Sequence, residues 1–179
     1  MEFYGLLTKG GFDMRILGID PGLAIVGWAV LDSERGNLRP VAFGAITTPA
    51  HTDIEARLLI IKNDLETIIG KYHPDEMAIE ELFFNTNITT GIAVAEARGV
   101  ILCTAHAKGV KISEYTPLQV KQAVVGYGKA EKKQVIAMVT SILKLKSPPK
   151  PDDTADAVAI AICHSQCAGS AIGKYYNQR

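Results

Sequence analysis

Three apolar runs rich in β-branched residues open the sequence, and short turn-forming stretches separate them. The runs cover residues 15–20, 24–31 and 38–47, with "DPG" after the first and "DSERGN" after the second. Consecutive strands joined by short turns pair antiparallel, so we expect a meander. This opening constrains the fold strongly, because every later element must extend that sheet or pack on it.

Helical and strand patterns alternate after the meander. One apolar stripe has steps of four and three residues, the spacing of one helix face: Ile54, Leu58, Ile61, Leu65 and Ile68. Further strands are predicted at 77–84 and 110–115, and helices at 86–107, 116–125, 131–145 and 153–168. We therefore expect an α/β fold of the ribonuclease H-like pattern, a mixed five-stranded sheet flanked by helices on both faces.

The length of 179 residues suits one domain. Residues 1–13 lack the basic region, long apolar region and cleavage site of a signal peptide. We expect residues 1–13 to be an N-terminal extension outside the fold, 14–168 to form a single domain and 169–179 to be a C-terminal tail. No apolar run approaches the roughly 18 residues of a membrane span, so we expect a cytoplasmic protein without a membrane partner.

Three cysteines are present, and Cys163 and Cys167 are four residues apart in a helical pattern. That spacing can serve a metal ion, but no second Cys or His pair has matching spacing. Small buried thiols are common. We therefore expect these cysteines to pack in the core.

Positive charge is concentrated in one part of the chain, although the formal net charge is zero. Residues 108–150 contain nine lysines and two glutamates, a net charge of +7 that the remaining residues balance with −7. Such asymmetry is typical of a basic patch for a polyanion beside an acidic region with another role. Lysines on solvated helix faces are the alternative explanation.

Four acids stand at the ends of predicted elements: Asp20, Glu80 or Glu81, Asp153 and Asp156. The last two are three residues apart and share one helix face. Carboxylates about 4 Å apart repel each other by roughly 4 kcal/mol at an effective dielectric constant of about 20. Oxygen ligands without Cys or His favour Mg²⁺ or Mn²⁺, and two such ions can hydrolyse a phosphodiester.

Each acid also has an ordinary structural explanation. Asp20 can be the first residue of a β-turn, and Asp152 or Asp153 can cap the last helix. Glu80 can end an edge strand in water. Strand alternation sends Glu80 and Glu81 to opposite faces, so spacing alone leaves that choice open.

Five blocks in order, from Met14 to about His164, together carry a family resemblance. They are "RILGIDPGLAIVGWAVLD", "PDEMAIEELFFNTN", "EARGV", "YTPLQVKQAVVGYGKAEKKQV" and "DDTADAVAIAICH". The first block alone is shared with sugar kinases and actin-like ATPases. All five blocks in this order resemble the RuvC family of bacterial Holliday-junction resolvases.

The resemblance implies a homodimeric endonuclease that nicks opposed strands of a four-way DNA junction symmetrically, in homologous recombination and DNA repair. It implies two Mg²⁺ ions per active site, with Mn²⁺ as a substitute, and the RuvA–RuvB branch-migration complex as a partner. The family acids fall on Asp20, Glu80, Asp153 and Asp156, with Asp152 as an extra neighbour.

The resemblance also assigns DNA contacts. The aromatic residue after the strand acid is Phe83, with Phe84 as the alternative, and Lys121 and Lys132 match positions of DNA contact. The helix with many small residues, 89–107, is either a dimer interface or an internal helix; we favour the interface.

Three other functions are weighed against a junction nuclease. An actin-like or sugar-kinase ATPase needs a second similar domain, for which this chain has no room. A non-catalytic module that binds DNA structures would not need all four acids. An RNA-processing nuclease of the same fold is disfavoured by the lysine-rich residues 119–133 and by Phe83.

Overall fold

A five-stranded sheet forms the centre of the computed structural model, which describes residues 13–82 and 88–168. The strands are β1 (Met14–Asp20), β2 (Ile25–Glu34), β3 (Asn37–Thr47), β4 (Glu76–Glu80) and β5 (Lys111–Tyr115). Their order across the sheet is β3-β2-β1-β4-β5. β1, β2 and β3 form the expected antiparallel meander, whereas β4 and β5 run parallel to β1. The predicted mixed sheet is confirmed.

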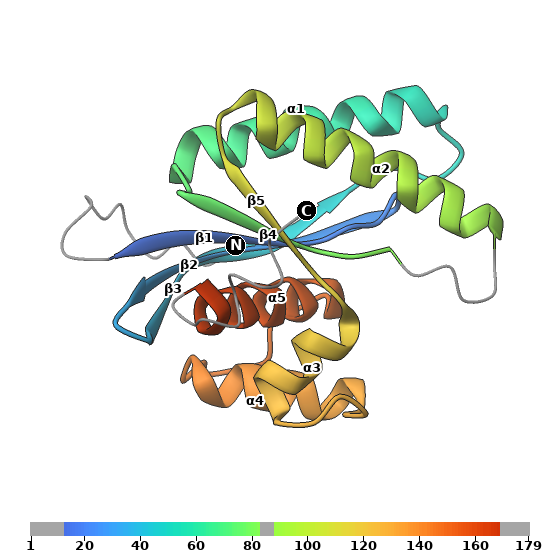
Figure 1. Ribbon diagram of the computed structural model, residues 1–179. Coiled ribbons are helices and arrows are strands. Elements are labelled where there is room, and N and C mark those ends of the chain that lie inside the picture. The colour runs from blue at the N-terminus through green and yellow to red at the C-terminus, as the bar shows by residue number, and fades with distance from the viewer. Residues whose placement is uncertain (1–12, 83–87, 169–179) are drawn as a thin grey trace.

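Helices cover both faces of the sheet, as predicted. On one face lie α1 (Ile54–Tyr72) and α2 (Ile88–Ala107), and on the other lies α5 (Asp152–Ala168) (Figure 1). α3 (Pro117–Val125) and α4 (Lys132–Ile142) pack on the outer side of α5. Within residues 13–82 and 88–168, none of the helices combines the length and hydropathy that a membrane crossing requires.

Two strand ends differ from the predicted ranges by more than one residue. β2 continues to Glu34, because the turn into β3 needs only Arg35 and Gly36. Both have positive φ, 48° and 84°, as in two-residue hairpin turns whose twist matches the strands. β4 ends at Glu80 because its partner β5 ends at Tyr115, so the prediction of strand at 81–82 was wrong.

The end of α4 also differs from the prediction. The helix stops at Ile142 instead of continuing to residue 145. Leu143 is the C-cap, and Lys144 adopts a left-handed conformation with φ of 52°. An L-residue in that conformation cannot continue a right-handed helix. Residues 145–150 therefore form an irregular segment between α4 and α5.

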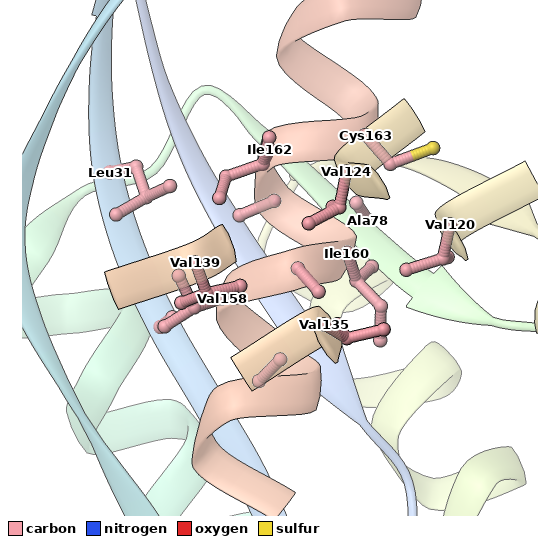
Figure 2. Close-up of a cluster of buried hydrophobic side chains, with 14 of the residues drawn as sticks. Leu31, Ala78, Val120, Val124, Val135, Val139, Val158, Ile160, Ile162 and Cys163 are labelled. Carbon is pink, nitrogen blue, oxygen red and sulfur yellow. The ribbon is translucent and has the colours of Figure 1, made fainter. Parts of the chain in front are cut away.

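The central position of α5 accounts for its apolar sequence. Figure 2 shows how side chains of α5 pack with those of the sheet and of the two outer helices. The labelled residues are Leu31 and Ala78 from strands, Val120 and Val124 from α3, Val135 and Val139 from α4, and Val158, Ile160, Ile162 and Cys163 from α5. Full burial of one large apolar side chain contributes about 1.5–3 kcal/mol. Cys163 is fully buried here, as the sequence predicted, whereas Cys167 is partly buried and Cys103 is exposed.

Two glycines allow α5 to lie close against the sheet. A Cβ at Gly18 of β1 would overlap the carbonyl oxygen of Ala157, and one at Gly27 of β2 would overlap that of Asp153. Glycine weakens a strand, and it often marks a place where another backbone approaches closely. Here the close approach brings the first turns of α5, with Asp153 and Asp156, to the end of β1.

Candidate active site

Two carboxylates end neighbouring parallel strands at the same edge of the sheet. Asp20 is the last residue of β1 and Glu80 is the last residue of β4. The residues before them, Ile19 and Ile79, are paired in register. Neighbouring strands lie about 4.8 Å apart, so the two carboxylates begin from adjacent positions on a rigid support.

Two further carboxylates reach this edge from α5. Asp153 and Asp156 lie in its first two turns and are half-buried. The negative charge of each raises the pKa of Asp20, and that of Asp156 also raises the pKa of Glu80. The other three acids that the sequence singled out therefore lie close enough to Asp20 for their charges to raise its pKa.

Burial and mutual repulsion both oppose ionisation in this cluster. Burial is the larger effect, and with the neighbouring acids it raises the pKa of Asp20 to about 8. Burial and the charge of Asp156 raise the pKa of Glu80 to about 7. Carboxyl groups with pKa values raised in this way gain strongly from a nearby cation.

Two lysines provide part of the missing positive charge. The Nζ atom of Lys132, from α4, lies 2.8 Å from Oδ2 of Asp156 and 4.0 Å from Oδ2 of Asp152. Partial burial opposes the charged form of Lys132, but the hydrogen bond with Asp156 and the surrounding acids leave its pKa above the ordinary value. The charge of Lys121, from α3, lowers the pKa of Glu80.

The start of α3 fixes the position of Lys121, and it follows the sequence prediction. The N-cap Thr116 accepts a hydrogen bond from the N–H of Gln119, whose side chain accepts one from the N–H of Thr116. Pro117 occupies the first helical position, where its missing N–H has no cost. This capping box places Lys121 one turn into the helix, facing the carboxylates.

A hollow of about 200 Å³ adjoins the acids, between the sheet edge and the three helices on that face. Its lining combines two acids, two lysines and four apolar residues: Glu80, Asp156, Lys121, Lys132, Pro117, Val120, Val135 and Ile160. An apolar wall lowers the local dielectric constant and strengthens the electrostatic interactions of the charged groups. The hollow is therefore suited to an anionic group held beside cations.

The structure separates the alternatives that spacing left open. Glu80 lines the hollow, whereas Glu81, just beyond the end of β4, donates its N–H to the carbonyl of Tyr115 over 2.8 Å. Asp152 is exposed at the first position of α5. Phe83 and its alternative Phe84 lie outside the described residues.

The four carboxylates offer a donor set that fits a hard divalent ion, since they supply only oxygen. Within the described part of the chain, no three candidate ligands stand together around one point, and the ammonium group of Lys132 lies against Asp156. An ion ligated by Asp156 would take the place of this lysine contact. The carboxylate oxygens therefore suit a divalent ion, but the Lys132 side chain has to move away from Asp156 before an ion can bind there.

Sequence reasoning missed two features of this site. The apolar wall of Val120, Val135 and Ile160 is indistinguishable from ordinary core positions in the sequence. The close contact of α5 with the sheet did have a signal, because Gly18 and Gly27 interrupt predicted strands.

Together the sheet order, the flanking helices and the acidic cluster define a nuclease domain of the ribonuclease H-like class. A sequence model of the family described as "Crossover junction endodeoxyribonuclease RuvC" matches residues 16–164, and the chain belongs to this family. It is therefore an endodeoxyribonuclease, a hydrolase of a nuclease family that depends on divalent metal ions.

Curated relatives agree over most of the chain. The crossover junction endodeoxyribonuclease RuvC of Clostridioides difficile (strain 630) is 53% identical over 152 residues, which cover 85% of this chain and 90% of that protein. The protein of the same name from Brevibacillus brevis is 55% identical over 153 residues, which cover 86% of this chain and 92% of that protein.

Solved structures agree with the fold. The chain is similar to "T. thermophilus RuvC in complex with Holliday junction substrate", with a TM-score of 0.82, 34% identity, and coverage of 87% of this chain and 94% of that one. The yeast mitochondrial Holliday junction resolvase Ydc2 has a TM-score of 0.64 at 13% identity, and the match covers 86% of this chain and 78% of that one. That second likeness shows the fold alone.

Proposed function

We propose that this protein resolves Holliday junctions by paired, symmetrical, metal-dependent nicks during homologous recombination and DNA repair. The observation that carries the proposal is the convergence of Asp20, Glu80, Asp153 and Asp156 at one sheet edge, with raised pKa values for the first two. The T. thermophilus relative, 34% identical, is described in complex with a Holliday junction substrate. Residues 14–168 form the nuclease domain in this proposal.

The four carboxylates hold two Mg²⁺ ions per active site, for which Mn²⁺ is a substitute. Two such ions supply Lewis-acid stabilisation and activation of water in phosphodiester hydrolysis. Asp20, which is fixed at the end of a central strand, contributes the ligand whose position varies least. Lys132 exchanges its contact with Asp156 for a phosphate when the ions and the DNA bind.

Lys121 and Lys132 contact the DNA backbone, since both line the hollow that also contains Glu80 and Asp156. Contacts of lysine with phosphate depend on salt and carry little sequence information.

Phe83 stacks against or separates bases at the crossover. We expect Phe83→Ala to lower the cleavage rate without changing the unfolding midpoint in urea. Loss of stability together with activity would instead make Phe83 a core residue.

The substrate has approximate two-fold symmetry, so a homodimer with two equivalent sites suits it. One side of α2 packs into the core through Ala97, Ile101 and Ala105. Gly99 lies on its exposed side, with no atom within 4 Å of a Cβ built there. Glycine inside a helix costs about 1 kcal/mol relative to alanine. Close approach of a second α2 would explain its presence, and we place the dimer contact there.

Gly99→Leu tests this interface. We expect it to weaken dimerisation at least about ten-fold in analytical ultracentrifugation, because a leucine would hold the two helices apart. Gly70→Leu in α1 is the matched control, since a Cβ at Gly70 also meets nothing within 4 Å. Equal effects of the two changes would exclude this part of α2 from the dimer contact.

The family relation also supports cooperation with the RuvA–RuvB branch-migration complex. The curated relatives are bacterial proteins, and bacterial DNA lies in the cytoplasm, so we place the reaction there.

Incubation with a mobile synthetic four-way junction, a linear duplex and an RNA hairpin, each with Mg²⁺ or with EDTA, tests the function. We expect paired nicks in opposed strands of the junction only, and only with the metal. Cleavage of RNA in preference would favour an RNA-processing nuclease. Binding of the junction without any cleavage would favour a non-catalytic module.

A further inference from the structure

A groove of about 720 Å³ runs along β3, the strand at one edge of the sheet. The C-terminal half of α1 forms one wall, residues 145–150 form the other, and residues 40–45 of β3 lie between them. Figure 1 shows β3 as the outermost strand on this side. The volume is within the range of specific binding sites, about 300–1,000 Å³. None of the four clustered acids lines this groove.

The backbone of β3 is open toward an incoming chain. Within the described residues β3 pairs only with β2, and an edge strand presents unpaired N–H and C=O groups at alternate residues. Ala42, Gly44 and Ala45 are small, which leaves room beside the strand. Pro40 and the bulge near Val41 interrupt the regular edge, so pairing is confined to residues 42–47, a length of about 20 Å.

The groove is positively charged. Lys71, Lys146 and Lys150 line it, and no Asp or Glu is among the lining residues. Lys146 and Lys150 are exposed, and neither forms an ion pair with any carboxylate in residues 13–82 and 88–168. Charge complementarity therefore favours an acidic occupant.

We propose that this groove binds an acidic segment of a partner protein in extended conformation, which adds to the sheet as a sixth strand beside β3. Strand addition derives affinity from main-chain hydrogen bonds and specificity from alternate side chains. Apolar side chains of the segment pack against the groove walls, and its acidic side chains meet the lysines. This interaction is separate from cleavage and from the dimer contact on α2.

A protein segment suits the groove better than a single strand of nucleic acid. Nucleic acid needs open aromatic faces for base stacking. The Trp28 ring is packed against Gly44 and lies 5.8 Å from the Tyr72 ring, and the Nζ atom of Lys71 lies 5.1 Å over Tyr72. These rings are already partnered, whereas the backbone edge is not.

The position of Trp28 provides a direct readout, because it is the only tryptophan in the chain and lines the groove. A display library of random dodecapeptides is selected on the full-length protein, and enriched peptides are titrated while tryptophan fluorescence is followed. We expect enrichment of sequences that alternate apolar and acidic residues, with saturable changes in Trp28 emission.

Two variations distinguish strand addition from general electrostatic attraction. In an extended peptide, the N–H groups of every second residue face β3 and the others point away from it. N-methylation of the residues that face β3 should abolish binding. N-methylation of the intervening residues should leave the dissociation constant within about two-fold. Lys146→Glu should weaken binding about ten-fold. Lys144→Glu is the matched control, exposed two residues away and outside the groove, and should change binding less than two-fold.

Three outcomes would overturn the proposal. The first is a selection that enriches no peptide affecting Trp28. The second is binding that responds equally to both phases of N-methylation, or equally to the two lysine changes. The third is an oligo(dT) twelve-mer that changes Trp28 emission with the same dependence on Lys146, which would assign the groove to nucleic acid.

Discussion

Acids lie near both ends of the parallel strands, but their negative charge is balanced by basic side chains at one end much more fully than at the other. At the carboxyl ends, Asp20 and Glu80 face further acids, and their pKa values are raised. Near the amino end of β1, Asp32 is 1% exposed but receives two hydrogen bonds from Arg15, at 2.6 Å and 3.0 Å. Arg15 therefore balances the buried charge of Asp32, whereas no arginine or lysine pairs directly with the carboxylate of Asp20 or Glu80 within the described residues.

A second carboxylate near the amino ends of the strands, that of Glu76, also has a basic partner. Lys111 donates to Oε1 of Glu76 over 3.0 Å, and Nε2 of His164 lies 3.0 Å from its other oxygen. The hydroxyl of Tyr115 is 2.8 Å from Nδ1 of His164. Burial lowers the pKa of His164 despite the nearby Glu76, so its ring is neutral at neutral pH.

The difference between the two ends separates structural charge from functional charge. A buried carboxylate without a partner costs several kcal/mol. The protein meets that cost at one end with Arg15 and Lys111. At the other end it leaves four acids with only Lys121 and Lys132 beside them, so Asp20 and Glu80 take up protons near neutral pH unless cations bind.

The largest expected effect is on catalysis. Asp20→Asn should lower the rate of junction cleavage by at least about a thousand-fold, because it removes a ligand from the ions that stabilise the transition state. Binding of the junction, measured by fluorescence anisotropy, should be retained or tighter, since less negative charge faces the phosphates. Unchanged nicking would exclude Asp20 from the mechanism.

Glu80→Gln and Glu81→Gln form a matched pair for the same comparison. Both change one strand-end glutamate to its uncharged isostere, but only Glu80 lines the hollow. We expect the first change to approach the effect of Asp20→Asn, and the second to stay within a few-fold of wild type. A reversed order would assign the metal ligand to Glu81.

The next largest effect is on stability at the compensated end. Arg15→Ala leaves the buried Asp32 carboxylate without its partner, and we expect a loss of about 3 kcal/mol in the free energy of unfolding, measured in urea. Arg15→Ala combined with Asp32→Ala should lose less than Arg15→Ala alone, because no unpaired charge remains. An additive loss would mean that the pair does not compensate the charge of Asp32.

The smallest expected effect is the pH dependence at the uncompensated end. Because the pKa values of Asp20 and Glu80 are raised, the folded state without metal binds more protons than the unfolded state. Stability therefore falls as pH rises above about 4, the unfolded-state pKa, and levels off once pH exceeds about 8. We expect a loss of about 2 kcal/mol from these acids between pH 6.5 and 8.5 in EDTA, measured by urea unfolding.

Asp20→Asn and Mg²⁺ provide the controls for this measurement. A hydrogen bond from Cys163 lowers the pKa of Cys167 to about 7, so its titration opposes the acids in the same window. The quantity to compare is therefore the difference in slope between wild type and Asp20→Asn. The variant should lose less stability with rising pH, and millimolar Mg²⁺ should restore the wild type at pH 8.5. Identical slopes would contradict the raised pKa of Asp20.

Much of this fold and site is predictable because its signals are local. The apolar runs define the strands, and Asp20 and Glu80 stand where those runs end. The contact between Lys132 and Asp156 is not local, because it depends on how α4 packs against α5. The hollow beside the acids is likewise formed by side chains from separate helices, each of which looks like ordinary core in the sequence.

The contact of α5 with Gly18 and Gly27 has a consequence for how accurately the acids are spaced. Main-chain atoms meet there directly, so no change of rotamer can absorb an error in the separation between the strand acids and the helix acids. The gap across which two cations would sit is therefore set by backbone geometry. Any larger residue at either glycine would push Asp153 and Asp156 outward together and widen that gap.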